Sequence, residues 1–94
     1  MHVTNASFTI PPVLLDPTCV AQVEVEGTEF LHRAMPVAAM VGNVPVEFIV
    51  VNAAGTEFVG LLRTHPQAGD ILKVGYLDSE LVDTAFTYTT PVVA

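Results

Sequence analysis

Apolar side chains in this chain recur at every second position, not at the three- and four-residue spacing of a helix. No long segment places apolar residues at i, i+3, i+4 and i+7, whereas Val, Thr, Phe and Ile are plentiful. A period of two puts successive side chains on opposite faces of a pleated strand, which β-branched and aromatic residues suit well. The sequence therefore predicts an all-β fold with at most one short helix.

The patterned segments are short and regularly spaced. They cover about 2–10, 19–26, 28–34, 44–51, 56–63, 71–77 and 80–90. The prolines of 11–17 cannot donate to a sheet ladder, so that segment is a connection. We expect one domain over 1–94, a small barrel or sandwich of about six to seven mainly antiparallel strands.

Two segments leave helix and strand open. Residues 35–43 suit either a short helical turn or an irregular strand, because apolar runs of this length cannot be assigned by periodicity. A helical turn over 78–84 is also allowed, since Asp78 and Ser79 are good N-cap residues.

The first expected hairpin joins 19–26 to 28–34 through a two-residue loop at Glu26-Gly27 or Gly27-Thr28. Either loop places Val23 and Val25 on one face with Phe30 and His32, whereas a slip of one residue would mix apolar and charged positions.

The second expected hairpin joins 44–51 to 56–63 over Asn52–Gly55. Asn at the first turn position and Gly at the fourth are typical of a type I turn, here with Gly55 left-handed and a bulge. Both faces of this hairpin are apolar: Val46, Phe48 and Val50 share one with Phe58 and Leu62, and Ile49 and Val51 share the other with Val59 and Leu61. The pattern indicates central strands or a subunit interface.

The tetrapeptide Gly-Thr-Glu-Phe occurs twice, at 27–30 and 55–58. It could present Glu29 and Glu57 as twin ligands or acids. The two copies have different flanks and different spacers before the next arginine, and repeat architectures need three or more stacked units. We favour paired turns or a decayed duplication, with each Phe entering the core.

Composition excludes several classes of protein. The formal charge is −7, and the cations are Lys73, Arg33 and Arg63, so the basic footprint of a nucleic-acid-binding protein is missing and an anionic membrane would repel the chain. The longest apolar stretch, 35–51, is too interrupted to span a bilayer. A single cysteine and an N-terminus without signal-peptide features favour the cytoplasm.

The chain is richer in apolar residues than its size requires. They make up 51% of 94 residues, whereas so short a chain buries only about 60–65% of its unfolded surface. The surplus must be exposed or covered by another copy. We therefore expect a homo-oligomer, assembled through the second hairpin or an exposed edge.

No motif predicts catalysis, a metal or a cofactor. The histidines lack ligand spacing, and Cys19 has only Asp16 nearby in sequence, which would not activate a thiol. The most concentrated polar group comprises His32, Arg33, Arg63, His65 and Asp70, at the ends of neighbouring hairpins, where a ligand could bind between subunits. A surface ion pair between Arg63 and Asp70 is the plainer interpretation.

Three functions remain open. The favoured one is an acidic cytoplasmic binding or adaptor module, leaning away from an enzyme, that forms a homo-oligomer through apolar β surfaces and binds a protein or small molecule. The alternative is a small-molecule-binding or catalytic barrel with its site near the 63–70 loop. The third is an acidic inhibitor of a basic partner.

Overall fold

The computed structural model describes residues 1–31 and 35–93, and within them it contains eight β-strands and no helix. The strands are β1 (His2–Ile10), β2 (Ala21–Thr28), β3 (Val37–Val41), β4 (Val44–Val51), β5 (Glu57–Leu62), β6 (Ile71–Tyr76), β7 (Val82–Thr87) and β8 (Val92–Val93). The predicted all-β class is confirmed, and the eighth strand, two residues long, exceeds the expected number.

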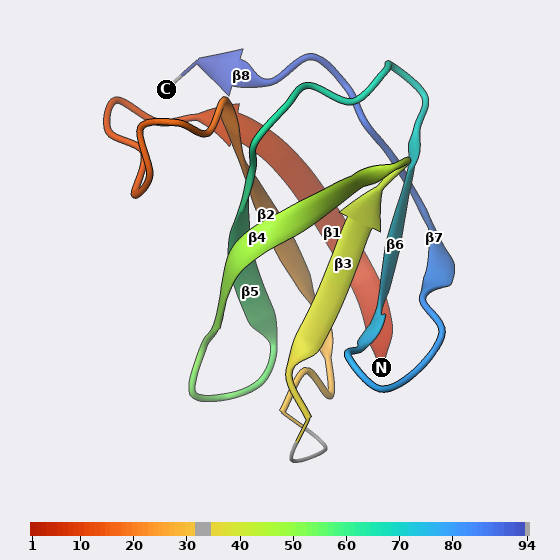
Figure 1. Ribbon diagram of the computed structural model, residues 1–94. Coiled ribbons are helices and arrows are strands. Elements are labelled where there is room, and N and C mark those ends of the chain that lie inside the picture. Colours follow the sequence, from red (N-terminus) through yellow and green to blue (C-terminus); the bar gives the residue numbers. More distant parts are fainter. Residues whose placement is uncertain (32–34, 94) are drawn as a thin grey trace.

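All eight strands belong to one sheet that curls into a half-barrel, in the order β7-β6-β3-β4-β5-β2-β1-β8 (Figure 1). Neighbouring strands are antiparallel except β8, which pairs in parallel with the end of β1. β4 crosses between the two halves, pairing with β3 at Val44 and Pro45 and with β5 further along. Beyond Pro45, β3 and β4 separate, as Figure 1 shows.

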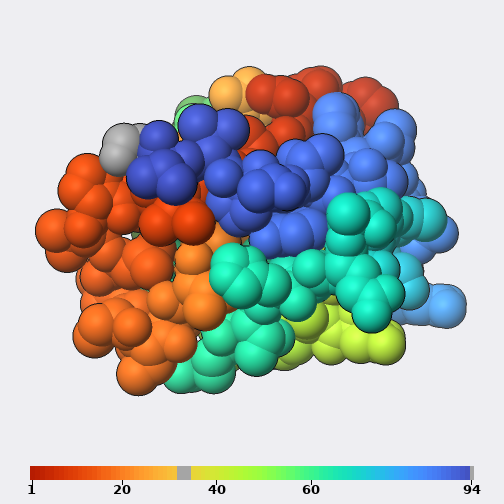
Figure 2. Space-filling model, turned by 90° about the horizontal axis from the view of Figure 1, so that it is seen from above, coloured from red at the N-terminus to blue at the C-terminus, as the bar shows by residue number. Residues whose placement is uncertain are grey.

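The concave side of the sheet holds one continuous core. Its fully buried large side chains are Phe30, Phe58, Leu62, Leu72, Val23, Val25 and Val41. Phe8 and Tyr88 meet edge-to-face with ring centroids 4.9 Å apart, which joins β1 to the segment after β7. Seen from above, that segment crosses the end of the molecule between the chain after β1 and the chain around residues 60–70 (Figure 2).

The predicted hairpin over Asn52–Gly55 is confirmed, and its strands are central in the sheet. Gly55 has φ 69°, and its N–H donates to the Asn52 carbonyl at 3.1 Å. The Asn52 side-chain oxygen accepts from the N–H groups of Thr56 and Glu57. The turn residues therefore act locally, as the sequence indicates.

The register predicted for this hairpin is correct only at one end. Val46 lies opposite Leu62 in the core as expected, but the ladder shifts between Glu47 and Val50. Beyond this bulge Val51 lies opposite Phe58, so Ile49 and Val51 pack against the core, while Phe48 and Val50 are exposed. A bulge adds one residue to one strand and so exchanges the faces of those that follow.

The first predicted hairpin is wrong. β2 continues through Gly27 to Thr28 between β1 and β5, and residues 29–31 form no strand. The remaining positions of the expected second strand, 32–34, lie outside the described residues. Gly27 serves a close approach and not a loop, since a Cβ there would overlap the His2 carbonyl oxygen and lie 2.9 Å from Phe30 Cζ. Phe30 still joins Val23 and Val25 in the core.

The two ambiguous segments contain no helical turn. Residues 37–41 form β3, and a turn from Tyr76 to Ser79, in which the Ser79 N–H donates to the Tyr76 carbonyl at 3.0 Å, precedes β7. Leu81 packs over Gly75, where a Cβ would lie 3.0 Å from Leu81 Cδ2. Tertiary packing thus decided both cases.

Candidate functional site

Three of the five residues predicted to form a ligand site are described, and two are not. His32 and Arg33 lie outside the described residues, so their part in a site stays a prediction. Arg63 directly follows β5, His65 lies in the next loop, and Asp70 directly precedes β6. These three side chains do not contact one another, and each has its own hydrogen-bond partners.

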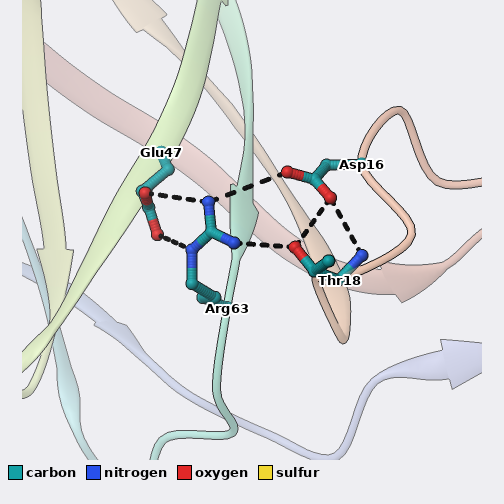
Figure 3. A network of polar contacts seen from close by, with 4 residues as sticks. All are labelled: Asp16, Thr18, Glu47 and Arg63. Carbon is teal, nitrogen blue, oxygen red and sulfur yellow. Dashed lines mark hydrogen bonds and ion pairs between the residues drawn. The ribbon is translucent and has the colours of Figure 1, made fainter.

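Arg63 is the centre of a polar network that ties β5 to β4 and to the connection before β2 (Figure 3). Its Nε donates to Glu47 Oε2 at 2.9 Å and its Nη2 to Oε1 at 3.3 Å, a two-pronged contact. Its Nη1 donates to Thr18 Oγ1 at 2.7 Å, and Nη2 lies 3.7 Å from Asp16 Oδ2. The ion pair expected between Arg63 and Asp70 is not formed, because Glu47 and Asp16 take the guanidinium.

The groups of this network shift one another's protonation. Hydrogen bonds from the hydroxyl and N–H of Thr18 lower the pKa of Asp16, and Arg63 adds to that effect. The Glu47 carboxylate raises the pKa of Arg63 above its usual value. The Asp16 carboxylate and the Arg63 guanidinium therefore stay charged at neutral pH. Their charge-assisted hydrogen bonds connect neighbouring segments of the fold, and neither group is set to act as an acid or base.

His65 and Asp70 connect the loop between β5 and β6 to the segment that follows β7. His65 Nδ1 lies 3.2 Å from the hydroxyl of Tyr88, whose pKa is raised by burial. The Asp70 carboxylate accepts from the Gln67 N–H at 3.0 Å, and the Tyr88 N–H donates to the Asp70 carbonyl at 2.8 Å. Both side chains therefore have structural partners in place.

Cys19 is buried beside the Arg63 network. Burial raises the pKa of its thiol, and the negative charge of Asp16 adds to the increase. A thiol in this state is a poor nucleophile, which agrees with the structural interpretation of this residue.

Sequence reasoning missed the position of Phe48. Its backbone φ of 55° is left-handed and its side chain is 47% exposed, although Phe favours neither condition. The Arg63 Cζ atom lies 5.8 Å from the centre of the ring, close enough for a cation–π contact. A bulky residue in this conformation costs about 1–3 kcal/mol, and no sequence pattern signals it.

An apolar groove of about 550 Å³ lies where β3 and β4 separate. We call it the β3–β4 groove, and six of its lining residues define it: Ala38, Met40, Pro45, Ile49, Leu77 and Leu81. None of the described residues that line it carries a charge. Phe48 precedes Ile49 in β4, so the strand that carries the exposed ring also supplies one wall of the groove.

Comparisons with protein-family models, with curated proteins and with solved structures found no match to this chain. Among residues 1–31 and 35–93, no group of three or more His, Cys, Asp or Glu side chains is placed to hold a metal ion. The same part of the chain contains no helix that is long and apolar enough to cross a membrane. The candidate site comprises Phe48 and the β3–β4 groove.

Proposed function

We propose that the protein is a non-enzymatic binding module of the cytoplasm that self-associates through its second hairpin. The observation that carries this proposal is Phe48, an exposed ring on a left-handed backbone in the strand that also lines an uncharged groove. In the assembly, Phe48 and Val50 of one copy pack into the β3–β4 groove of the other.

The surface around Phe48 suits a symmetric pairing of identical copies. In a twofold interface the same surface of each copy takes part, so that residue i of one copy contacts residue j of the other and the reverse. A single surface must therefore carry both the projecting group and the groove that receives it. β4 carries the projecting Phe48 and one wall of the groove. Glu47 and Arg63 likewise supply both signs of charge within 2.9 Å of each other, and an isologous contact can exchange them between copies.

The scale of the surface also permits such an interface. A stable interface buries about 800 Å² on each partner, and the accessible surface of the chain is 5383 Å². Val50 is 64% exposed next to Phe48, so the hairpin offers apolar surface that water disfavours. A second copy covers this surface without any change in fold.

Sedimentation and native mass spectrometry test this proposal on the purified full chain. Phe48→Asn removes the ring but keeps a residue that tolerates a left-handed backbone, so the fold is retained. We expect the wild type to be oligomeric and Phe48→Asn to be monomeric at the same concentration. The matched control is Val13→Asn, which replaces a side chain that is 83% exposed in the connection after β1.

The control variant should assemble as the wild type does. A monomeric wild type at about 100 μM, or a Phe48→Asn variant that assembles equally well, contradicts the proposal. Circular dichroism of each variant establishes that the β fold persists, so a loss of assembly can be assigned to the ring.

A further inference from the structure

A hollow of about 410 Å³ lies between the beginnings of β1 and β7. We call it the seam hollow, and we define it by six of its lining residues: His2, Val3, Val74, Val82, Thr84 and Ala85. At the other end of these strands the gap is closed, because β8, which continues the chain beyond β7, pairs with β1 at Thr9 and Ile10 (Figure 1). The ring contact between Phe8 and Tyr88 lies at the same end. β1 and β7 therefore diverge toward the hollow as the sides of a wedge.

Neither side of this wedge has a strand partner at the hollow. β7 is the last strand at one edge of the sheet, and among the described residues it pairs with β6 alone. β1 pairs with β2 on one side and with β8 only at its end, and no ladder in the described part of the chain joins β1 to β7. Two main-chain edges thus border one gap, and edges of this kind accept a further strand.

Strand direction determines how such a strand would run. Six successive antiparallel pairings lead from β7 through β6, β3, β4, β5 and β2 to β1, so β1 and β7 run in the same sense. They could pair with each other only in parallel, which is less stable per residue than antiparallel pairing. One added strand that runs opposite to both would instead pair antiparallel on each side.

The side chains at the hollow favour an apolar occupant. Val82 lies opposite Val74 in the β6–β7 ladder, so both point to the concave side of the sheet. Val74 is 4% exposed within the core, whereas Val82 is 68% exposed. Val3, on β1, packs against the core from the other side of the hollow. The concave face is therefore uncovered at Val82, and the alternate apolar side chains of an added strand would cover it.

We propose that the seam hollow binds an extended peptide segment of a partner protein, which runs antiparallel to both β1 and β7. Alternate apolar side chains of the peptide cover Val3 and Val82, and its main-chain groups pair with both strands. Because the chain carries a formal charge of −7, the outward side chains of the peptide are neutral or basic.

The width of the wedge sets where the peptide lies. The Cα atoms of β1 and β7 come within 8 Å of each other at their closest, whereas two strands that flank a third lie about 9–10 Å apart. The peptide therefore occupies the wide end of the wedge, at Val3 and Val82, and stops short of Phe8.

The test uses a seven-residue probe, acetyl-Lys-Val-Thr-Val-Thr-Val-Lys-amide, which places valine on one face of a strand and polar side chains on the other. Titration of the isotope-labelled full chain, followed by amide chemical shifts, gives the affinity and the location. We expect shifts at residues 2–6 and 82–86, and nuclear Overhauser effects from the peptide main chain to both β1 and β7. Without peptide, these signals should not change with protein concentration.

Two control peptides separate main-chain pairing from apolar burial. Methylation of the three valine nitrogens removes the donors along one edge of the peptide, and it should weaken binding at least about tenfold, as the loss of three hydrogen bonds requires. A peptide of the same composition with its three valines adjacent keeps the apolar surface but loses the alternation. It should also bind at least about tenfold more weakly.

One variant of the protein tests the hollow itself. Val82→Lys places a charge on the concave side of an edge strand and should abolish binding, while the exposure of this position leaves the fold intact. The matched control is Val13→Lys, which adds the same charge at a position that is 83% exposed in the connection after β1. This control should bind the probe as the wild type does.

The proposal is overturned if the methylated or the rearranged peptide binds as the probe does, if Val82→Lys binds as the wild type does, or if the shifts reach only one of the two strands. An absence of shifts up to millimolar probe also overturns it. Concentration-dependent shifts without peptide would assign the hollow to a second copy and overturn it too. Phe48→Asn should bind the probe as the wild type does, because Phe48 takes no part, so this proposal and self-association can fail separately.

Discussion

The rings of Phe30 and Phe58 meet edge-to-face, with centroids 4.9 Å apart and planes at 80°. They end the two copies of Gly-Thr-Glu-Phe. The copies are hydrogen-bonded to each other, because the Phe30 N–H donates to the Gly55 carbonyl at 3.0 Å and the Gly27 N–H to the Thr56 carbonyl at 2.8 Å. The repeated tetrapeptide therefore builds one structural junction from two chain segments.

This junction should be energetically coupled. Replacing either ring by alanine should cost about 3–5 kcal/mol of unfolding free energy. Because the rings contact each other, a double-mutant cycle of Phe30→Ala and Phe58→Ala should show a coupling of about 0.5–1.5 kcal/mol. Urea denaturation measures all four corners, with Phe8→Ala/Phe58→Ala as a cycle between rings for which no ring contact is observed. Equal coupling in the two cycles would count against a specific junction.

Gly60 should tolerate no side chain. A Cβ there would overlap Val46 Cγ1 and lie 3.1 Å from the Glu47 carbonyl oxygen, where β4 bends at its bulge. We expect Gly60→Ala to destabilise the fold by about 1–3 kcal/mol, measured by urea denaturation. Ala53→Ser, at an exposed turn position, is the control and should change stability by less than about 0.5 kcal/mol. A neutral Gly60→Ala would show that β4 can move away.

The contribution of Asp16 to the free energy of unfolding should depend on pH. Its pKa is lowered in the folded chain from the usual 3.8, chiefly by Thr18. A carboxyl whose folded pKa is depressed stabilises the fold above its unfolded pKa, and this contribution is lost as pH falls from about 3.8 through the folded pKa. Asp16→Asn should therefore destabilise the protein at pH 7 and have a smaller effect near pH 2. Urea denaturation at both values checks the sign, and a larger effect at pH 2 would contradict it.

Cys19 should resist alkylation in the folded state. Its thiol is buried and its pKa is raised by that burial, and only the exposed thiolate reacts. Iodoacetamide at pH 8 should label the native chain at least about a hundredfold more slowly than the urea-unfolded chain, because reaction must await opening. Mass spectrometry follows the modification. Equal rates in the two states would show an accessible thiol.

Much of the fold could be predicted where the signal is local. The alternation of Ala6, Phe8 and Ile10 fixed both the extent and the inward face of β1, and the Asn52–Gly55 turn followed from its own residues. The candidate site could not be found in this way, because the exposure of Phe48 follows from the bulge in β4, and its ring contact comes from Arg63, which follows β5. The partners of Arg63 were missed for a similar reason: Glu47 and Asp16 are distant in sequence.

By itself the sequence determined the strand class, the polar loops and the second hairpin, since period-two patterning and turn residues act over a few neighbouring positions. Only the tertiary structure decided that Gly27 continues a strand, that Phe48 is exposed and that β1 and β7 run in the same sense. Each of these depends on which strands become neighbours, and that choice is made by packing between segments far apart in the chain, where local preference has little weight.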